Sequence, residues 1–262
     1  MTLKIAIAGA AGRMGQALIR IAGERADRIA IVGGSERAGS EAVGRQLAPG
    51  AVISDSVGKA AAVADVWIDF TTPEATLAAL DQLANTNVKA AIVGTTGLAP
   101  IHDQKIAAHA KRIAIVKSGN FSLGVNLLLA LIEQAGKRLG SDWDIEISET
   151  HHRRKVDAPS GTALMMGEAA AGTRGKKLND VRVAPYDGQT GPRKPGAITF
   201  AVTRGGGVIG DHEIKFISDE EIVSIGHHAI DRALFARGAL EAAEWAAKQK
   251  PGLYTMRDVL AL

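Results

Sequence analysis

The residues whose types could do chemistry are concentrated between positions 149 and 162, in the order Glu-Thr-His-His-Arg-Arg-Lys-Val-Asp-Ala-Pro-Ser-Gly-Thr. Two imidazoles, three cations and two carboxylates are far more polar chemistry than a connecting loop needs. An imidazole gains and loses a proton close to neutral pH, which suits it to general acid catalysis. We therefore predict an active site here, against the competing interpretation of a solvated basic face.

The end of this stretch is suited to binding an anion. Ser160-Gly161-Thr162 opens an apolar run at 163–171 that is typical of a helix, and the first amides of a helix have no partner within it. Those amides and the two hydroxyls favour a carboxylate or phosphate. Lys155, with the arginines at 153 and 154, adds positive charge. The predicted ligand is a small anion.

A metal site is not predicted. His151 and His152 lie where the strand expected at 144–149 ends. Neighbouring residues of a strand point to opposite faces, so the two imidazoles do not easily bind one ion. No second group of histidines or cysteines has the spacing of zinc ligands.

Composition excludes several classes of protein. The chain of 262 residues has no cysteine, which excludes disulfides and thiol nucleophiles. Its formal net charge of +3 comes without a long basic stripe, so we expect no nucleic-acid partner. No window approaches the ~20 apolar residues of a membrane span, and the N-terminus lacks a signal-peptide pattern. We expect a globular protein that does not bind membranes and is cytoplasmic.

The N-terminus has the order strand, glycine turn, helix. An apolar strand at 3–8 runs into Gly9-Ala10-Ala11-Gly12-Arg13-Met14-Gly15, and a helical pattern follows at 16–22. Glycines let a backbone approach a pyrophosphate, which then rests on the helix N-terminus. The spacing G-x-x-G-x-x-G departs from the usual G-x-G-x-x-G, which weakens the match. We nevertheless predict a dinucleotide site.

An acidic and a basic residue follow the second predicted strand, 29–33. Glu36 lies where a carboxylate would bind the adenosine ribose, and Arg37 is placed to receive a 2′-phosphate. The pair predicts the use of NADH or NADPH, whereas the alternative is an ordinary surface ion pair.

Further apolar strands at 66–70, 90–93 and 113–116 alternate with helical patterns at 73–84 and 101–111. This alternation predicts an α/β fold with a Rossmann-like, doubly wound parallel sheet. Ligands of such sheets collect at the carboxyl ends of the strands. The small polar segments there, which we expect to line a nicotinamide-ribose cleft, are 70–72, Gly94-Thr95-Thr96-Gly97 and Ser118-Gly119-Asn120-Phe121.

The pattern changes after residue 122. A helix is predicted at 125–139, and strands at 198–203, 212–217 and 222–227 alternate and lie close together, as in a mixed or antiparallel sheet. We expect a second, α+β domain at 123–232. An amphipathic helix at 233–248 should pack back on the first domain, which then comprises 1–122 and 233–262. Structural roles are predicted for His102, His109, His212, His227 and His228, and a flexible loop for the glycine-rich segment 205–210.

Three motifs together resemble the dihydrodipicolinate reductase family of bacterial lysine and diaminopimelate biosynthesis. They are the glycine turn 9–15, Gly94-Thr-Thr-Gly97 with Asn120-Phe121-Ser122, and the specific Glu-x-His-His-x-x-Lys-x-Asp-x-Pro-Ser-Gly-Thr block at 149–162. The resemblance covers the whole chain. It implies a two-domain enzyme, usually a homotetramer assembled through the second sheet, that reduces a cyclic unsaturated dicarboxylate with NADH or NADPH.

The resemblance also implies roles for single residues. His151 matches the general acid and Lys155 a second proton donor. Substrate-binding positions match His152, Lys155, Gly161 and Thr162, and Ser160 belongs to the same turn. Nucleotide contacts match Gly9, Ala10, Ala11, Gly12, Arg13, Met14, Glu36, Arg37, Gly94, Thr95, Thr96, Ser118, Gly119, Asn120 and Phe121. Two rival classes stay open, another nicotinamide-dependent reductase of a small anion and a non-catalytic dinucleotide sensor.

Overall fold

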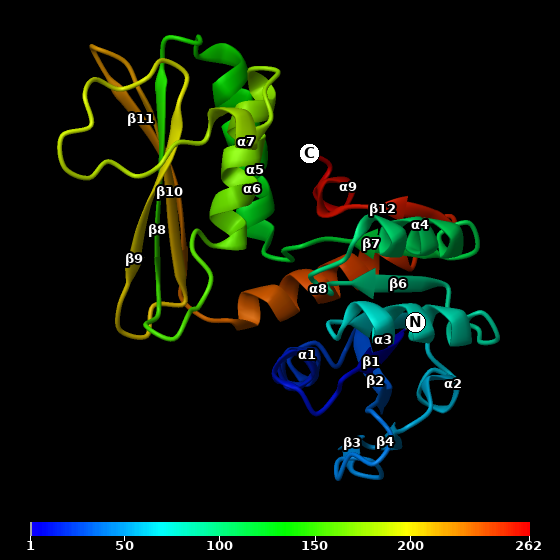
Figure 1. The fold of residues 1–262 in the computed structure, drawn as a ribbon. Helices are drawn as coiled ribbons and strands as arrows, with labels where there is room; N and C mark the ends of the chain where they lie inside the picture. The colour runs from blue at the N-terminus through cyan, green and yellow to red at the C-terminus, as the bar shows by residue number, and fades with distance from the viewer. Residues whose placement is uncertain (1) are drawn as a thin grey trace. The chain divides into compact units, whose positions relative to one another are not determined.

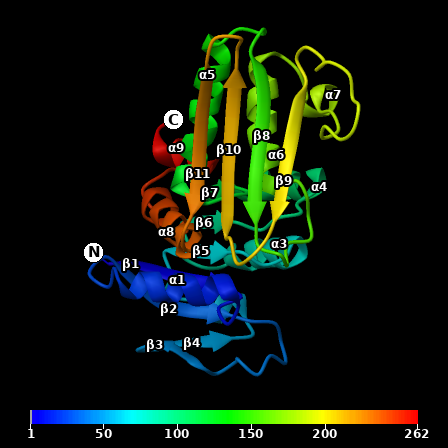
Figure 2. The same ribbon diagram turned by 90° about the vertical axis from the view of Figure 1, so that its left-hand side faces the viewer.

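The computed structural model describes residues 2–262, and it divides into two compact units (Figures 1 and 2). Unit 1 comprises Met1–Leu123 and Ala233–Leu262, and unit 2 comprises Gly124–Arg232. The chain therefore leaves unit 1 after Leu123 and returns to it at Ala233.

Unit 1 contains an eight-stranded sheet in the order β12-β7-β6-β5-β1-β2-β4-β3. All neighbouring strands are parallel except β3 and β4, which form an antiparallel edge. Their bounds are β1 Leu3–Ala8, β2 Ile29–Ser35, β3 Gln46–Ala48, β4 Ala51–Ser54, β5 Val66–Asp69, β6 Ala90–Val93, β7 Ala114–Lys117 and β12 Gly252–Tyr254. Strands β5 and β6 are buried along their whole length, which explains why their sequences are apolar apart from Asp69 at the end of β5.

Helices cover both faces of this sheet, as Figure 1 shows for unit 1. The side chains of Ile5 and Ile7 pack in one cluster with α1 (Arg13–Gly23), α8 (Ala233–Ala246) and α9 (Met256–Leu260). Those of Ala6 and Ala8 pack in a second cluster with α2 (Val57–Ala60), α3 (Pro73–Leu83) and α4 (Pro100–His109). Alternate side chains of β1 thus lie in two separate cores, one on each face of the sheet. The predicted doubly wound arrangement is confirmed.

Unit 2 contains a four-stranded sheet in the order β11-β10-β8-β9. The strands are β8 Asp144–His151, β9 Ile198–Arg204, β10 Gly210–Ile217 and β11 Ile222–Ala229. β8 and β9 are parallel, whereas β10 is antiparallel to β8 and β11. The buried side chains of β8, β9 and β10 pack against α5 (Leu123–Arg138), α6 (Gly161–Thr173) and α7 (Leu178–Val181). The sheet is mixed, as predicted.

Prediction from the sequence located the long helices and strands but missed the short ones. Strands β3, β4 and β12 have three or four residues each, and α2 and α7 have four, so none shows a measurable periodicity. Helix α8 belongs to unit 1. It packs closely on the backbone at Phe121, because a Cβ on Gly238 would lie 1.7 Å from the Phe121 carbonyl oxygen. No helix among residues 2–262 is both long and apolar enough to span a membrane.

Candidate active site

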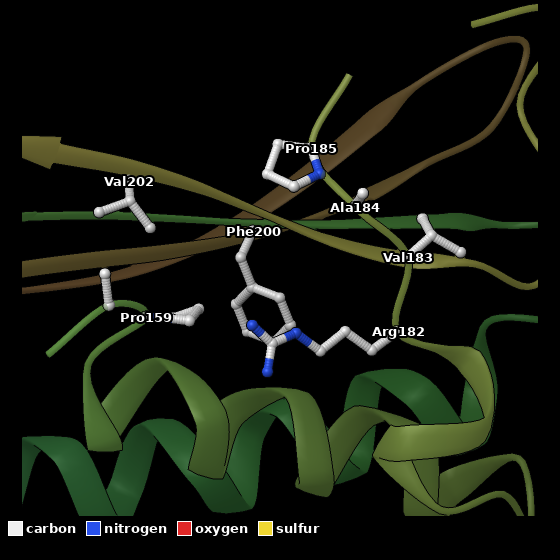
Figure 3. A pocket seen from close by; sticks show the side chains of 8 residues that line it. Pro159, Arg182, Val183, Ala184, Pro185, Phe200 and Val202 are labelled. Atoms are coloured by element: carbon white, nitrogen blue, oxygen red, sulfur yellow. The ribbon is translucent and has the colours of Figure 1, made fainter. Parts of the chain in front are cut away.

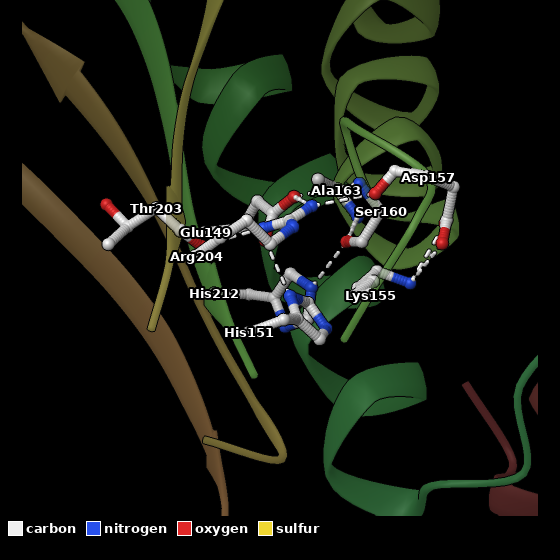
Figure 4. Close-up of polar contacts among 9 residues, drawn as sticks. All are labelled: Glu149, His151, Lys155, Asp157, Ser160, Ala163, Thr203, Arg204 and His212. Carbon is white, nitrogen blue, oxygen red and sulfur yellow. Dashed lines mark hydrogen bonds and ion pairs between the residues drawn. The ribbon is translucent and has the colours of Figure 1, made fainter. Parts of the chain in front are cut away.

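The centre of the polar cluster in unit 2 is a carboxylate and an imidazole at the end of β8. The side chains of β8 alternate, so Glu149 and His151 face the same side as the buried Ile145 and Ile147. Glu149 Oε2 lies 2.5 Å from His151 Nδ1. Figure 4 shows Glu149 held on its other side by Arg204 of β9, whose Nη1 and Nη2 each donate to one carboxylate oxygen at 2.7 Å.

Glu149 is a buried carboxylate that is fully hydrogen-bonded. Its side chain is 1% exposed. Burial alone would raise the pKa of Glu149, but the hydrogen bonds from Arg204, from His151 and from the Ser160 amide hold it below its usual range. The group is therefore an anion at neutral pH, and such paired charges tolerate burial because each oxygen has donors.

This carboxylate fixes the orientation of His151. Since an ionised carboxylate can only accept hydrogen bonds, Nδ1 of His151 carries a hydrogen and Nε2 is the nitrogen that can exchange a proton. The residue His151 is 8% exposed, so the surrounding protein holds its ring in place. A fixed imidazole with one free nitrogen is the arrangement that general acid catalysis requires.

The N-terminus of α6 lies beside this pair. Ser160 is the N-cap of α6, and its Oγ accepts from the Ala163 amide at 3.1 Å. The Ser160 amide donates to Glu149 Oε1 at 3.0 Å, which ties the start of the helix to the end of β8. Gly161 and Thr162 occupy the first turn, and a Cβ on Gly161 would meet nothing within 4 Å. The first turn of α6 is thus open to a ligand, as an anion site requires.

His212 also belongs to this cluster, which the sequence did not predict. Its Nε2 lies 2.8 Å from Ser160 Oγ, and its ring packs edge-on against His151 with centroids 5.0 Å apart. Burial, together with the facing His151, lowers the pKa of His212 to about 4. A neutral imidazole therefore bridges the N-cap of α6 and the imidazole of β8.

Lys155 and Asp157 stand on the loop between β8 and α6. The Lys155 ammonium donates to both oxygens of Asp157, at 2.8 and 2.9 Å, and this ion pair is visible in Figure 4. Lys155 holds the pKa of the Asp157 carboxyl below its usual value. The Asp157 carbonyl accepts from Arg204 Nη2 at 2.8 Å, which anchors the loop to the cluster.

His152 follows His151 directly, just beyond the end of β8. Its amide donates to the Val208 carbonyl at 2.7 Å, and partial burial, with Arg232 and Arg154 nearby, lowers the pKa of its imidazole. The glycine-rich segment 205–210 does more than connect strands, because the Gly205 amide donates to the His151 carbonyl at 2.9 Å. The backbone around both histidines is therefore supported by the loop between β9 and β10.

The predicted nucleotide residues all follow carboxyl ends of parallel strands in unit 1. Gly9 has φ +60°, and a Cβ on Gly15 would lie 2.5 Å from the Gly9 and Ala10 carbonyl oxygens, so both positions need glycine. The N-cap of α1 is Gly12, which has no side chain to cap the first amides. Glu36 Oε1 accepts from the Ala11 amide at 2.9 Å, so the structure brings the acidic residue onto the glycine turn.

The segments after β6 and β7 are more buried than the sequence implied. Thr95 is 4% exposed and bonds Thr76 Oγ1 at 2.7 Å, while Phe121 is 1% exposed and packs edge-on against Phe70. Arg37, Thr96 and Gly119 are exposed.

The polar cluster is separate from the apolar cavity of unit 2. That cavity, of about 440 Å³, is lined by Pro159, Arg182, Val183, Phe200 and their neighbours, with the Arg182 guanidinium 5.2 Å from the Phe200 ring centroid (Figure 3). Its lining contains no carboxylate or imidazole, unlike the polar cluster. Among residues 2–262, no three histidine, aspartate or glutamate side chains group as a metal site would need.

Sequence reasoning missed Arg204 and His212 because both lie more than fifty residues from their partners. Arg204 is 55 residues from Glu149, and His212 is 52 residues from Ser160. The parallel pairing of β8 with β9 and the antiparallel pairing with β10 bring them to the site. The sequence does contain one indication that His212 is buried. Residues of β10 alternate between the two faces of the sheet, and His212 shares a face with the apolar Ile214 and Phe216.

A parallel sheet with a glycine turn after its first strand, joined to an α+β unit that holds an oriented imidazole, is typical of two-domain nicotinamide-dependent oxidoreductases. Comparison with known proteins makes the assignment specific. The chain belongs to the dihydrodipicolinate reductase family: residues 3–121 match the model of the family's N-terminal part and residues 124–260 that of its C-terminal part.

Relatives of this family are similar along their whole length. The chain is 48% identical to 4-hydroxy-tetrahydrodipicolinate reductase of Parvibaculum lavamentivorans, with 99% of this chain and 98% of the relative covered. It is 48% identical to the enzyme of that name from Caulobacter vibrioides, with 98% and 97% covered. The fold also matches the dipicolinate-bound dihydrodipicolinate reductase of Paenisporosarcina sp. TG-14, at a TM-score of 0.80, 22% identity and coverage of 97% and 98%.

Proposed function

We propose that the chain reduces 4-hydroxy-tetrahydrodipicolinate to tetrahydrodipicolinate with NADH or NADPH, in lysine and diaminopimelate biosynthesis. Family membership supports the reaction. The structural observation that carries the proposal is the buried Glu149–His151 pair beside the open first turn of α6. It combines a proton donor with a binding site for a carboxylate, and the substrate is a dicarboxylate.

The residues of unit 1 fit a dinucleotide. Gly9 and Gly15 let the turn approach the start of α1, and the uncapped amides behind Gly12 suit a pyrophosphate. Ala11, Gly12 and Arg13 are exposed, so the turn is accessible. Glu36 would bind a ribose after releasing the Ala11 amide, and Ala10, Met14, Gly94, Thr96 and residues 118–121 complete the proposed contacts. When bound, a reduced nicotinamide supplies hydride.

The residues of unit 2 would bind the substrate. Its carboxylates would be held by Lys155, His152 and the Ser160-Gly161-Thr162 turn, where the helix amides and the positive end of the α6 dipole favour negative charge. Restricting the substrate to one pose contributes to rate, because the reacting atoms then meet in a fixed geometry.

His151 would then supply the proton that balances hydride addition. The overall change is the gain of one hydride and one proton and the loss of one water. Glu149 stabilises the protonated imidazole while His151 Nε2 presents its hydrogen, and Arg204 keeps Glu149 ionised. Lys155 is the proposed second donor. Such proton transfer typically contributes 10²- to 10⁴-fold to rate.

The direct experiment follows nicotinamide absorbance when the purified protein meets freshly prepared substrate, with NADH and NADPH in parallel. Turnover with either nucleotide supports the proposal. Nucleotide binding without turnover on this or any related cyclic dicarboxylate would favour a dinucleotide sensor. Turnover on a different small anion alone would favour another reductase.

Cofactor choice has its own test. We propose that the exposed Arg37 guanidinium meets the 2′-phosphate that distinguishes NADPH from NADH. Arg37→Ala should then raise the KM for NADPH about tenfold and leave that for NADH within about twofold. Equal losses with both nucleotides would contradict the assignment.

We also propose a cytoplasmic homotetramer assembled through the sheet of unit 2. The resemblance to the family supports it, as does the arrangement of unit 2, in which the apolar side chains of the sheet pack with helices on one face only. The opposite face carries Ala201, Ser224 and Lys215, all exposed in the single chain.

A further inference from the structure

The Lys155–Asp157 ion pair raises a question about the substrate site. Lys155 is a proposed ligand of a substrate carboxylate, yet its ammonium already faces a carboxylate at two hydrogen-bond distances, 2.8 and 2.9 Å. One ammonium that donates twice to Asp157 has little left to offer an incoming anion. The Asp157 side chain therefore stands where a ligand carboxylate is expected.

The two partners differ in how firmly they are held. The Lys155 side chain is 19% exposed, whereas that of Asp157 is 56% exposed. The backbone is anchored on both sides, because the Lys155 amide donates to the His152 carbonyl and the Asp157 carbonyl accepts from Arg204. Because more than half of the Asp157 side chain is exposed, it has room to rotate into solvent. The Asp157 carboxylate can therefore leave the ammonium without a change in the anchored backbone.

We propose that Asp157 is an internal competitor for the substrate: its carboxylate pairs with Lys155 and must be displaced before a dicarboxylate binds. This inference rests on the proposed function of the Lys155 site. Asp157 thereby sets the affinity for the anionic substrate and keeps Lys155 paired between turnovers. Its negative charge also disfavours any anion that does not displace it.

The size of the effect follows from the exposure of the pair. A partly exposed ion pair contributes little net free energy, so its replacement by an uncharged amide should tighten anion binding by about two- to fivefold. The direction of the change in anion affinity distinguishes two roles for Asp157. If Asp157 instead positioned Lys155 for the substrate, its removal would weaken binding.

The experiment measures the inhibition constant of dipicolinate, the KM of the substrate and the affinity for NADH on the full chain. For Asp157→Asn we expect a two- to fivefold lower inhibition constant and KM, turnover within about twofold and an unchanged NADH affinity. Asp157→Glu retains the charge and should resemble the unmodified chain. Asp219→Asn removes an exposed carboxylate from the turn between β10 and β11 and serves as the matched control.

The outcomes separate this inference from the proposed function. If the unmodified chain neither turns over substrate nor binds dipicolinate, the proposed function fails. If it does both, and Asp157→Asn binds dipicolinate equally or more weakly, the function stands and the competitor role is overturned. An equal gain with Asp219→Asn would assign the effect to net charge and would also overturn it.

Discussion

At the scale of single residues, the site depends on a carboxylate that orients an imidazole. Glu149 holds Nδ1 of His151, and the proton that we propose is transferred would then reside on Nε2. We expect His151→Gln to lower turnover by about 10²- to 10⁴-fold, because an amide has no transferable proton at neutral pH. Nucleotide affinity should change little, since the proposed nucleotide contacts lie in unit 1. Turnover with saturating cofactor and fluorescence titration with NADH test both parts, and unchanged turnover would remove His151 from the mechanism.

His212 gives a prediction about stability and pH. Its pKa in the folded chain is about 4, lowered chiefly by burial from the ordinary histidine value of 6.5. Between these two values the unfolded chain binds more protons than the folded one, so folding stability rises with pH through this window and is lost as pH falls from about 6.5 to 4. A difference of this size corresponds to about 3 kcal/mol.

This pH dependence is measurable by urea unfolding at several pH values. His212→Gln replaces the titrating ring by an amide, so the stability difference between pH 6.5 and pH 4 should shrink by up to about 3 kcal/mol. His102→Gln is the control, because that imidazole lies on α4 and bonds the Ala99 amide in unit 1. An identical pH dependence in the unmodified chain and in His212→Gln would contradict the burial of a neutral ring.

At the scale of elements, the tight register between β8 and β10 positions His151. Gly210 begins β10, and a Cβ added there would lie 3.0 Å from His151 Nε2. Gly210→Ala should therefore shift the imidazole by a few tenths of an ångström and lower turnover, by about tenfold, because small misplacements of reacting groups are costly.

The matched control for this substitution is Gly226→Ala in the neighbouring β11, where an added Cβ meets its neighbours at 3.4–3.9 Å. Both changes add one methyl group to a glycine within a strand of the same sheet. Equal turnover of the two variants would show that the space above Gly210 is not needed by His151.

The sequence predicted elements with a clear period and missed features that depend on pairing between distant segments. Strand 90–93 was predicted at its observed bounds because its four residues are apolar and buried. The Glu149–His151–Lys155 motif was recognisable because its members are adjacent in sequence. Arg204 and His212 were not, since only the three-strand pairing of β9, β8 and β10 brings them to the site. The position of Ser160 at the start of α6 was predictable from the sequence, but its hydrogen bond to His212 was not.

At the scale of the whole molecule, assembly is the property that one chain does not determine. The sheet of unit 2 has helices packed with one face, and its other face contains Ala201 in the middle of β9, exposed in the single chain. If the proposed tetramer packs through this face, Ala201→Arg would place an unpaired cation in the interface. We expect this variant to dissociate, because a buried charge without a partner costs several kcal/mol.

Light scattering coupled to size exclusion measures the outcome directly. The unmodified chain should have four times the 27.3 kDa mass of one chain, and Ala201→Arg should have a smaller mass. Val63→Arg adds the same side chain at a position of unit 1 that is 60% exposed, so it should leave the mass unchanged. If Ala201→Arg kept the full mass, the subunits would have to meet elsewhere. If the unmodified chain had the mass of a single chain, the proposed tetramer would be wrong and the exposed face of the sheet would belong to a monomer.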